Sequence, residues 1–257
     1  MKKRNLLLIP AIAMLGSSLC SAVGLIYNVN YLGGGAAVDP TTNLNGVIGG
    51  GGQIWNQATF TNVNDKFTDI VDSTGGTSTI DISGIFGGNN ASDALSGQAI
   101  FSGNTAIHNK GEDRTIQISQ LTIGGYYDIY IYSLSHSTSS WGTTDTERSA
   151  GDFTTSNAVG NGTSQSLNNG ILGTTAATFA LGQNYVLFHD IVADGTGTIS
   201  IVADAFDGVD GIANGVTGGI GDTRLQVNGM QIVSVPETST AALLGLGGLA
   251  LVLRRRK

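Results

Sequence analysis

Residues 115–134 read Thr-Ile-Gln-Ile-Ser-Gln-Leu-Thr-Ile-Gly-Gly-Tyr-Tyr-Asp-Ile-Tyr-Ile-Tyr-Ser-Leu and decide the fold class. From Thr115 to Leu121 apolar and polar side chains alternate, as in a β-strand with one buried face. Ile123-Gly124-Gly125 is typical of a turn, because glycine adopts the backbone angles that tight turns require. From Tyr126 to Leu134 both alternating sets are largely apolar, which favours a strand at the centre of a sheet.

Similar strand patterns recur between residues 23 and 234, and no stretch there shows the 3.6-residue period of a helix. The chain holds 39 Gly and only 3 Pro, which is typical of an exported all-β protein with many turns. We therefore expect one β-sandwich or barrel. The expected strands are Gly24–Tyr31, Ser78–Ile85, Ala99–Ser102, Thr115–Leu121, Tyr126–Leu134, Gly151–Ser156, Ala176–Leu181, Asn184–Ile191, Gly197–Ala203 and Leu225–Val233, with a turn at Asn161-Gly162 and a bulge at Asn228-Gly229.

Residues 1–22 have the three parts of a secretory signal peptide. Three cations, Lys2, Lys3 and Arg4, precede an apolar stretch, Leu6–Leu15, and a small-residue cleavage site, Cys20-Ser21-Ala22. Cleavage after Ala22 removes the only cysteine, so the mature protein is expected to have no disulfide.

Residues 235–257 combine a Val-Pro-Glu element, an uncharged apolar segment and four terminal cations. The 16 residues Thr238–Leu253 form about 24 Å of helix, which spans a hydrocarbon core of roughly 30 Å only marginally. We expect a short C-terminal transmembrane helix with its Arg cluster in the cytoplasm and everything upstream outside.

The region between the two ends, residues 23–234, is strongly acidic. It holds 5 Lys or Arg and 18 Asp or Glu, a formal net charge of −13. Nucleic acid is excluded as a partner, because phosphate binding needs clustered cations. The Gly-rich stretches contain no phosphate-binding motif, so we interpret them as turns.

Catalytic patterns are weak. No Gly-x-Ser-x-Gly element accompanies the three histidines. His189 is interpreted as a core or edge residue of a strand, and His108 and His136 as loop residues. Their scattered positions give no zinc-binding spacing. We expect a protein without enzymatic activity; a carbohydrate-active hydrolase or lyase, which needs two facing carboxylates, is the alternative.

Two loops carry candidate binding residues. Asp204, Asp207 and Asp210 place carboxylates at every third position of a Gly-containing loop, which suits calcium; a solvated acidic loop is the alternative. The loop His136–Asp152 places Trp141 among polar residues, and a sugar ring packs well on an exposed aromatic side chain flanked by such groups. The flanking polar residues are Asp145, Glu147 and Arg148. Trp141 folded back onto the core is the alternative here, and core packing is our expectation for Trp55.

The C-terminal 23 residues resemble a PEP-CTERM sorting signal. The resemblance rests on Val235-Pro236-Glu237, the Gly- and Leu-rich segment Gly245–Ala250, and Arg254, Arg255 and Arg256. It implies export by a Gram-negative, often biofilm-forming bacterium, transient anchoring in the inner membrane, and processing by an exosortase. Thr238 stands where that family usually has a second Pro, which also gives a partial likeness to a Gram-positive sortase motif. The short Gly-rich span with its Arg run fits PEP-CTERM better.

The middle region resembles the galactose-binding-like jelly-roll β-sandwiches that often precede such tails. The resemblance rests on Ile54-Trp55-Asn56, Tyr126–Tyr132, Asn184-Tyr185-Val186 and Val227–Val233. It implies a jelly-roll β-sandwich at residues 23–234, permits glycan binding and supplies no catalytic residue. We expect a surface or extracellular-matrix protein with extracellular polysaccharide as its candidate ligand; a purely structural matrix component is a further alternative.

Overall fold

The computed structural model describes residues 24–33, 44–60, 66–84, 100, 106–108, 113–134, 150–168, 178–205 and 225–236. Leu25–Val235 is a compact unit. The regular structure of the described residues is β-strand, without an α-helix. Nothing in these ranges is a helix long and apolar enough to cross a membrane. The expected signal peptide and the tail from Glu237 onward lie outside the described residues.

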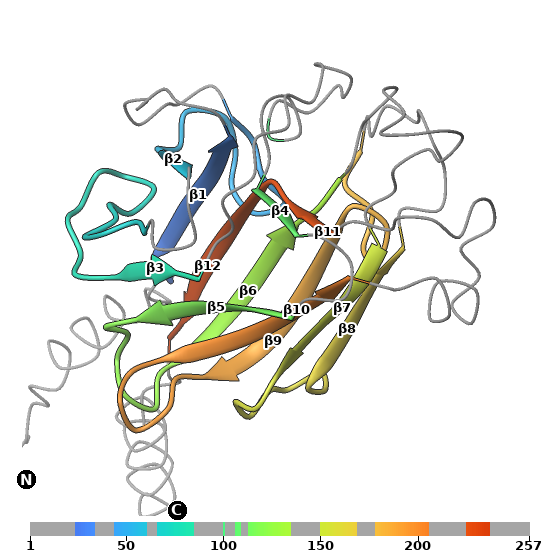
Figure 1. Cartoon of the computed structure of the whole chain (residues 1–257). Coiled ribbons are helices and arrows are strands. Elements are labelled where there is room, and N and C mark those ends of the chain that lie inside the picture. The colour runs from blue at the N-terminus through green and yellow to red at the C-terminus, as the bar shows by residue number, and fades with distance from the viewer. Residues whose placement is uncertain are drawn as a thin grey trace, which may run out of the picture. The chain divides into compact units, whose positions relative to one another are not determined.

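The strands form two five-stranded sheets packed face to face and one separate strand pair (Figure 1). The strands are β1 Ile26–Gly33, β2 Asn56–Phe60, β3 Asp81–Ser83, β4 Ala106–His108, β5 Arg114–Ser119, β6 Tyr126–Tyr132, β7 Ala150–Thr155, β8 Ser164–Asn168, β9 Tyr185–Val192, β10 Ile199–Ala205, β11 Leu225–Val227 and β12 Gly229–Val235. The first sheet has the order β2-β1-β12-β6-β9 and the second β3-β5-β10-β7-β8, while β11 pairs with β4. The expected all-β sandwich is confirmed.

The main core lies between the two sheets. Both sheets contribute branched aliphatic and aromatic side chains that are fully or almost fully buried. Burying each such side chain contributes about 1.5–3 kcal/mol, so this layer is the main source of stability. Its members include Ile116 and Ile118 of β5, Ile129 and Ile131 of β6, Phe153 of β7, Phe188 of β9, and Ile199 and Ile201 of β10.

A second apolar cluster covers the outer face of the first sheet. Tyr130 and Tyr132 alternate with the core isoleucines of β6, and they pack with Trp55, which has no exposed surface. Segment 44–54 lies against this face through Leu44, Val47 and Ile48. The two clusters explain why β6 is apolar on both faces, as expected, and they confirm the prediction that Trp55 belongs to the core.

Several expected strands have other bounds or partners. The expected strand Leu225–Val233 divides at Asn228: β11 pairs with β4, and β12 pairs with β1 and β6. A strand at Ala176–Leu181 is wrong for its described part, which forms only a bridge to β9. The partner of β7 is β8, a polar strand for which the sequence predicted no strand. Its buried side chain is Leu167. Placing His108 in a loop is also wrong, because it belongs to β4.

The pairing directions give the sandwich two different ends. At the terminal end β1 begins and β12 stops, and the chain makes the turns 120–125, 156–163 and 193–198 between strands. At the opposite end, the loop end, β1, β6, β8 and β10 stop while β7, β9 and β12 begin. The expected turn at Asn161-Gly162 is confirmed, and Gly162 has the left-handed φ of 97° that favours glycine.

Candidate functional site

The binding residues predicted from the sequence fall mostly outside the described residues. This holds for Trp141, Asp145, Glu147 and Arg148, for Asp207 and Asp210, and for Glu237 and Arg254–Arg256. Asp204 is described: it lies in strand β10 rather than in a loop, with an exposed side chain, opposite Asp152 of β7. Val235 is the last residue of β12, and Pro236 follows it.

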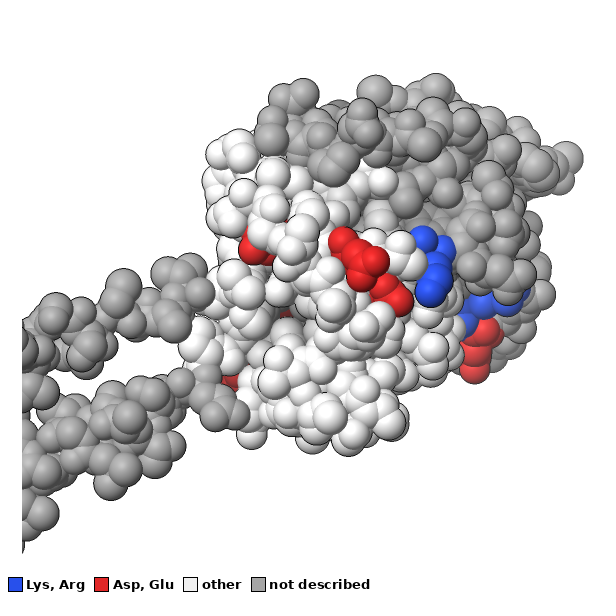
Figure 2. All heavy atoms as spheres, turned by 90° about the vertical axis from the view of Figure 1, so that its left-hand side faces the viewer, with Lys and Arg blue, Asp and Glu red and all other residues white. Residues whose placement is uncertain are grey.

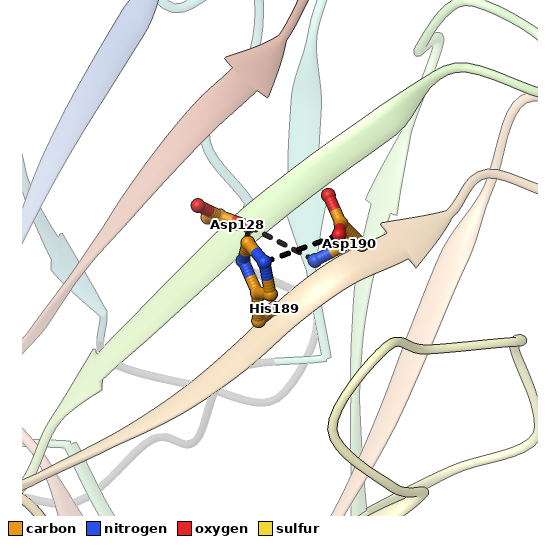
Figure 3. Close-up of side chains that lie close together, drawn as sticks. All are labelled: Asp128, His189 and Asp190. Carbon is orange, nitrogen blue, oxygen red and sulfur yellow. Dashed lines mark hydrogen bonds and ion pairs between the residues drawn. The ribbon is translucent and has the colours of Figure 1, made fainter.

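The described residues contain a cluster that the sequence analysis did not identify, formed by Asp128 of β6 with His189 and Asp190 of β9 (Figure 3). The Nδ1 atom of His189 lies 2.7 Å from Oδ1 of Asp128. Its Nε2 atom lies 3.1 Å from Oδ2 of Asp190. The imidazole therefore lies between two carboxylates, with one of them at each ring nitrogen.

A β-bulge brings these three side chains together. The pairing of β6 with β9 shifts between Tyr127 and Ile129, so that His189 and Asp190 together lie opposite Asp128. Asp190 has a left-handed φ of 55°, which a residue with a side chain seldom adopts. In a regular strand, successive side chains point to opposite faces. The bulge suspends that alternation and lets two consecutive side chains meet one carboxylate.

Backbone hydrogen bonds hold the bulge in place. The backbone N–H of Asp190 donates to Oδ1 of Asp128 at 2.9 Å, and that of His189 donates to Oδ1 of Asn161 at the same distance. The N–H of Gly160 donates to the carbonyl oxygen of His189 at 2.7 Å. A side chain at Gly160 would crowd Asp190, since its Cβ would lie 3.2 Å from the Cβ of Asp190. The turn between β7 and β8 thus fixes the backbone of His189, and Asp128 holds the N–H of Asp190.

The cluster is accessible and rich in negative charge. The exposed fraction of the side chain is 53% for His189, 38% for Asp190 and 18% for Asp128. Among the described residues, the group that pairs with these carboxylates is the imidazole itself, with no Lys or Arg in contact. Charged side chains are sparse more generally, as Figure 2 shows for one face of the molecule.

The arrangement limits what the cluster can do chemically. A carboxylate only accepts hydrogen bonds, so an imidazolium with two N–H donors satisfies both contacts. A catalytic histidine in a nucleophile–His–acid triad keeps one nitrogen for the acid and turns the other toward the nucleophile. Here both nitrogens face carboxylates, so the geometry gives no support to triad chemistry. Oxygen and imidazole nitrogen atoms are also metal ligands, and one such atom from each residue lies within 4.8 Å of the others.

Aromatic side chains of the second apolar cluster adjoin the Asp128 cluster on the outer face of the first sheet. Tyr130 follows Asp128 on that face, and its ring centroid lies 6.2 Å from that of Tyr185 on β9. Burial raises the pKa of Tyr130, and the neighbouring charge of Asp128 raises it further. Leu187, half buried, lies opposite Tyr130 in the register. The Asp128 cluster therefore borders the second apolar cluster, whose nearest members are buried or half buried.

One sequence signal for the cluster does exist. Asp128 interrupts a strand that is otherwise apolar on both faces, and charge at such a position needs a partner. In β9, Val186 and Phe188 point into the core, so strict alternation would place Asp190 there as well. Ile191 occupies the core instead, and this change of phase indicates the bulge.

Comparison with known proteins found no matching family model, no similar curated protein and no similar solved structure.

Proposed function

We propose that this chain is an exported surface or matrix protein without enzymatic activity, and that its β-sandwich binds extracellular polysaccharide of a Gram-negative bacterium. Two observations support the proposal. The two terminal segments of the sequence have the composition of export and sorting signals, and the described part of the chain between them is a β-sandwich. The tail is the substrate of an exosortase-type enzyme and holds the protein at the inner membrane until it is processed.

A jelly roll is the finer fold that we propose for the sandwich. Eight of its strands support this, with the orders β1-β12-β6-β9 and β5-β10-β7-β8. The first and last strands are neighbours in one sheet, and β5 to β6, β6 to β7, β8 to β9 and β9 to β10 each pass from one sheet to the other. Eight-stranded double sheets of this kind are common in lectin domains, although a fold alone assigns no ligand.

The observation that carries the proposed function is the separation of the two ends of the sandwich. The last strand stops at Val235 on the terminal end, one residue before Pro236, so the sorting segment is attached there. Segment 135–149 joins β6 to β7, and both of its attachment points lie at the loop end. A sandwich tethered at one end can present the loops of the other end to a ligand. Trp141 belongs to that segment.

Mass spectrometry of the mature surface protein tests the sorting step. With exosortase processing, the surface form should lack every peptide beyond about residue 240, because cleavage near Pro236-Glu237 removes the apolar segment and the Arg cluster. Deleting the exosortase of the producing strain should retain the full tail in the membrane fraction. Arg254–Lys257 still attached to the surface form would show a plain membrane anchor instead.

Affinity electrophoresis through gels that contain bacterial exopolysaccharide tests the ligand. Wild-type protein should be retarded, and Trp141→Ala should lose the retardation because a sugar ring loses its stacking surface. Tyr126→Ala is a matched control, since Tyr126 is an exposed aromatic residue at the terminal end. Equal migration of the wild type and Trp141→Ala in every polysaccharide would refute binding through this loop. Product release from any polysaccharide would favour the carbohydrate-active enzyme.

A further inference from the structure

The cluster Asp128–His189–Asp190 has features that a purely structural ion pair does not need. One cross-strand pair already links β6 to β9 through Asp128 and His189. The bulge adds a second carboxylate to the same imidazole, in an unfavourable backbone conformation. Strained backbone of this kind costs about 1–3 kcal/mol and is concentrated at functional sites.

The donor set selects a class of ligand. Two carboxylates attract a cation, and a solvated histidine adds a nitrogen donor that calcium and magnesium do not favour. Imidazole combined with carboxylate oxygen suits zinc, and zinc sites with three protein ligands keep a position for water or a substrate atom. We propose that Asp128, His189 and Asp190 bind one Zn²⁺ ion at the outer face of the β6–β9 pair.

To hold the ion, the cluster requires a rotation of the His189 imidazole and a closer approach of the ligand atoms. Zinc bonds of about 2.1 Å in a tetrahedral arrangement place neighbouring ligand atoms roughly 3.4 Å apart. The ligand atoms of this cluster are already within 4.8 Å of one another. The two carboxylates now face different ring nitrogens, so one nitrogen must turn toward both. The imidazole of His189 is half exposed, which leaves it room to rotate.

The backbone around the cluster supports the ligands before an ion arrives. Asn161 and Gly160 fix the main chain of His189, and Asp128 itself holds the N–H of Asp190. Ligands that are already positioned lose less conformational entropy on binding. Because the cluster lies toward the terminal end of β6 and β9, this inference does not depend on polysaccharide binding at the loop end.

Isothermal titration of ZnCl₂ into the purified, chelator-treated full-length chain tests the proposal. The wild type should bind one zinc ion per chain. His189→Ala and the near-isosteric Asp128→Asn should each weaken binding by about tenfold or more. His136→Ala is the matched control, a histidine outside the cluster, and should bind like the wild type. Thermal unfolding without zinc checks that each variant is folded.

Substitution with Co²⁺ gives an independent readout, because its visible absorption reports the coordination of the metal. Wild-type protein should develop a cobalt band that His189→Ala lacks, and Asp190→Asn should change it. Zinc binding that survives in both His189→Ala and Asp128→Asn would overturn the proposal, as would loss of binding in His136→Ala. Binding of Ca²⁺ that Asp128→Asn abolishes but His189→Ala leaves intact would also overturn it, since the cluster would then act through its carboxylates alone.

Discussion

Replacing Gln231 with Leu should strongly destabilise the sandwich while keeping nearly the same side-chain volume. Gln231 lies fully buried in β12, where its side chain joins the first sheet to segment 44–54. Its Nε2 donates to Oδ1 of Asn28 at 2.7 Å and to the carbonyl oxygen of Ile48 at 2.9 Å. Its Oε1 accepts from the N–H of Ile48 at 3.1 Å and from the hydroxyl of Tyr132.

The expected loss follows from these four hydrogen bonds. Each contributes about 1 kcal/mol net, and a buried partner left unsatisfied costs about 1–3 kcal/mol. Asn28 and Tyr132 are buried and each loses a hydrogen-bond partner, whereas Ile48 is half buried, so its backbone groups can bind water instead. A total of about 4 kcal/mol results. For a domain of this size it corresponds to a fall in Tm of roughly 8–16 °C.

Urea and thermal unfolding of the purified chain measure this loss. Gln117→Leu is the matched control, since Gln117 is exposed on β5 and its substitution should change the free energy of unfolding by no more than about 0.5 kcal/mol. Gly46→Ala perturbs the same network independently, because a Cβ there would lie 2.3 Å from Oε1 of Gln231. If the free energies of unfolding of Gln231→Leu and Gln117→Leu differ by less than about 1 kcal/mol, the hydrogen bonds of Gln231 do not hold segment 44–54 in place.

Two further perturbations test the turns. Gly84→Ala should lower the free energy of unfolding by about 3 kcal/mol or more, because φ is 77° and a Cβ would lie 1.7 Å from a carbonyl oxygen of β5. Gly50→Ala is the control, because no atom lies within 4 Å of a Cβ at Gly50; equal losses in urea unfolding would contradict the clash at Gly84. Burial acts to raise the pKa of Asp72, but hydrogen bonds from Thr74 and the turn backbone outweigh it and lower the pKa below 3.8. A lowered folded-state pKa adds stability that is present above about pH 4 and lost as the pH falls below it. Asp72→Asn should therefore be less stable than the wild type at pH 7 and converge with it near pH 2 in urea unfolding; a difference that stays constant with pH would count against this.

The central part of the fold could be predicted from the sequence because its residues follow simple periodic rules. The strands β5 and β6 alternate or are apolar throughout, and Gly124 marks the turn between them with a φ of 70°. Partner choice could not be predicted, since alternation specifies which face is buried and not which strand lies beside it. The division at Asn228 has that origin, since one continuous pattern forms two strands with different partners: β11 pairs with β4, and β12 pairs with β1 and β6.

The Asp128 cluster was missed for a related reason. Strand assignment by alternation assumes a constant period of two, and a bulge changes the phase within a strand. The expected strand Asn184–Ile191 includes His189 and Asp190 but assumes regular alternation through them, whereas β9, Tyr185–Val192, has a bulge at these two residues. Strict alternation places the charged Asp190 in the core and the apolar Ile191 on the outer face. These two misplacements at consecutive positions together indicate a bulge.

Asparagine side chains explain how a Gly-rich chain without an expected disulfide holds its strands together. A side-chain amide offers the same donor and acceptor as a peptide group, so it can pair with backbone groups that no neighbouring strand reaches. Asn161 does so along the edge of β9 that faces away from β6, bonding the carbonyl oxygen of Leu187 and the N–H of His189. Other buried or half-buried asparagines repeat the device. Three of them join segments that are distant in sequence: Asn56 bonds Asn28 and Val71, Asn157 bonds Val192, Thr198 and Ser200, and Asn228 bonds Leu134. Asn184 acts locally and bonds Thr178 and Ala180. Glycine in a turn has no side chain with which to make contacts. The asparagine amides therefore provide the directional hydrogen bonds between the strands and turns. At β9 the same device closes an edge that could otherwise pair with another chain, and it leaves the side chains of His189 and Asp190 facing solvent.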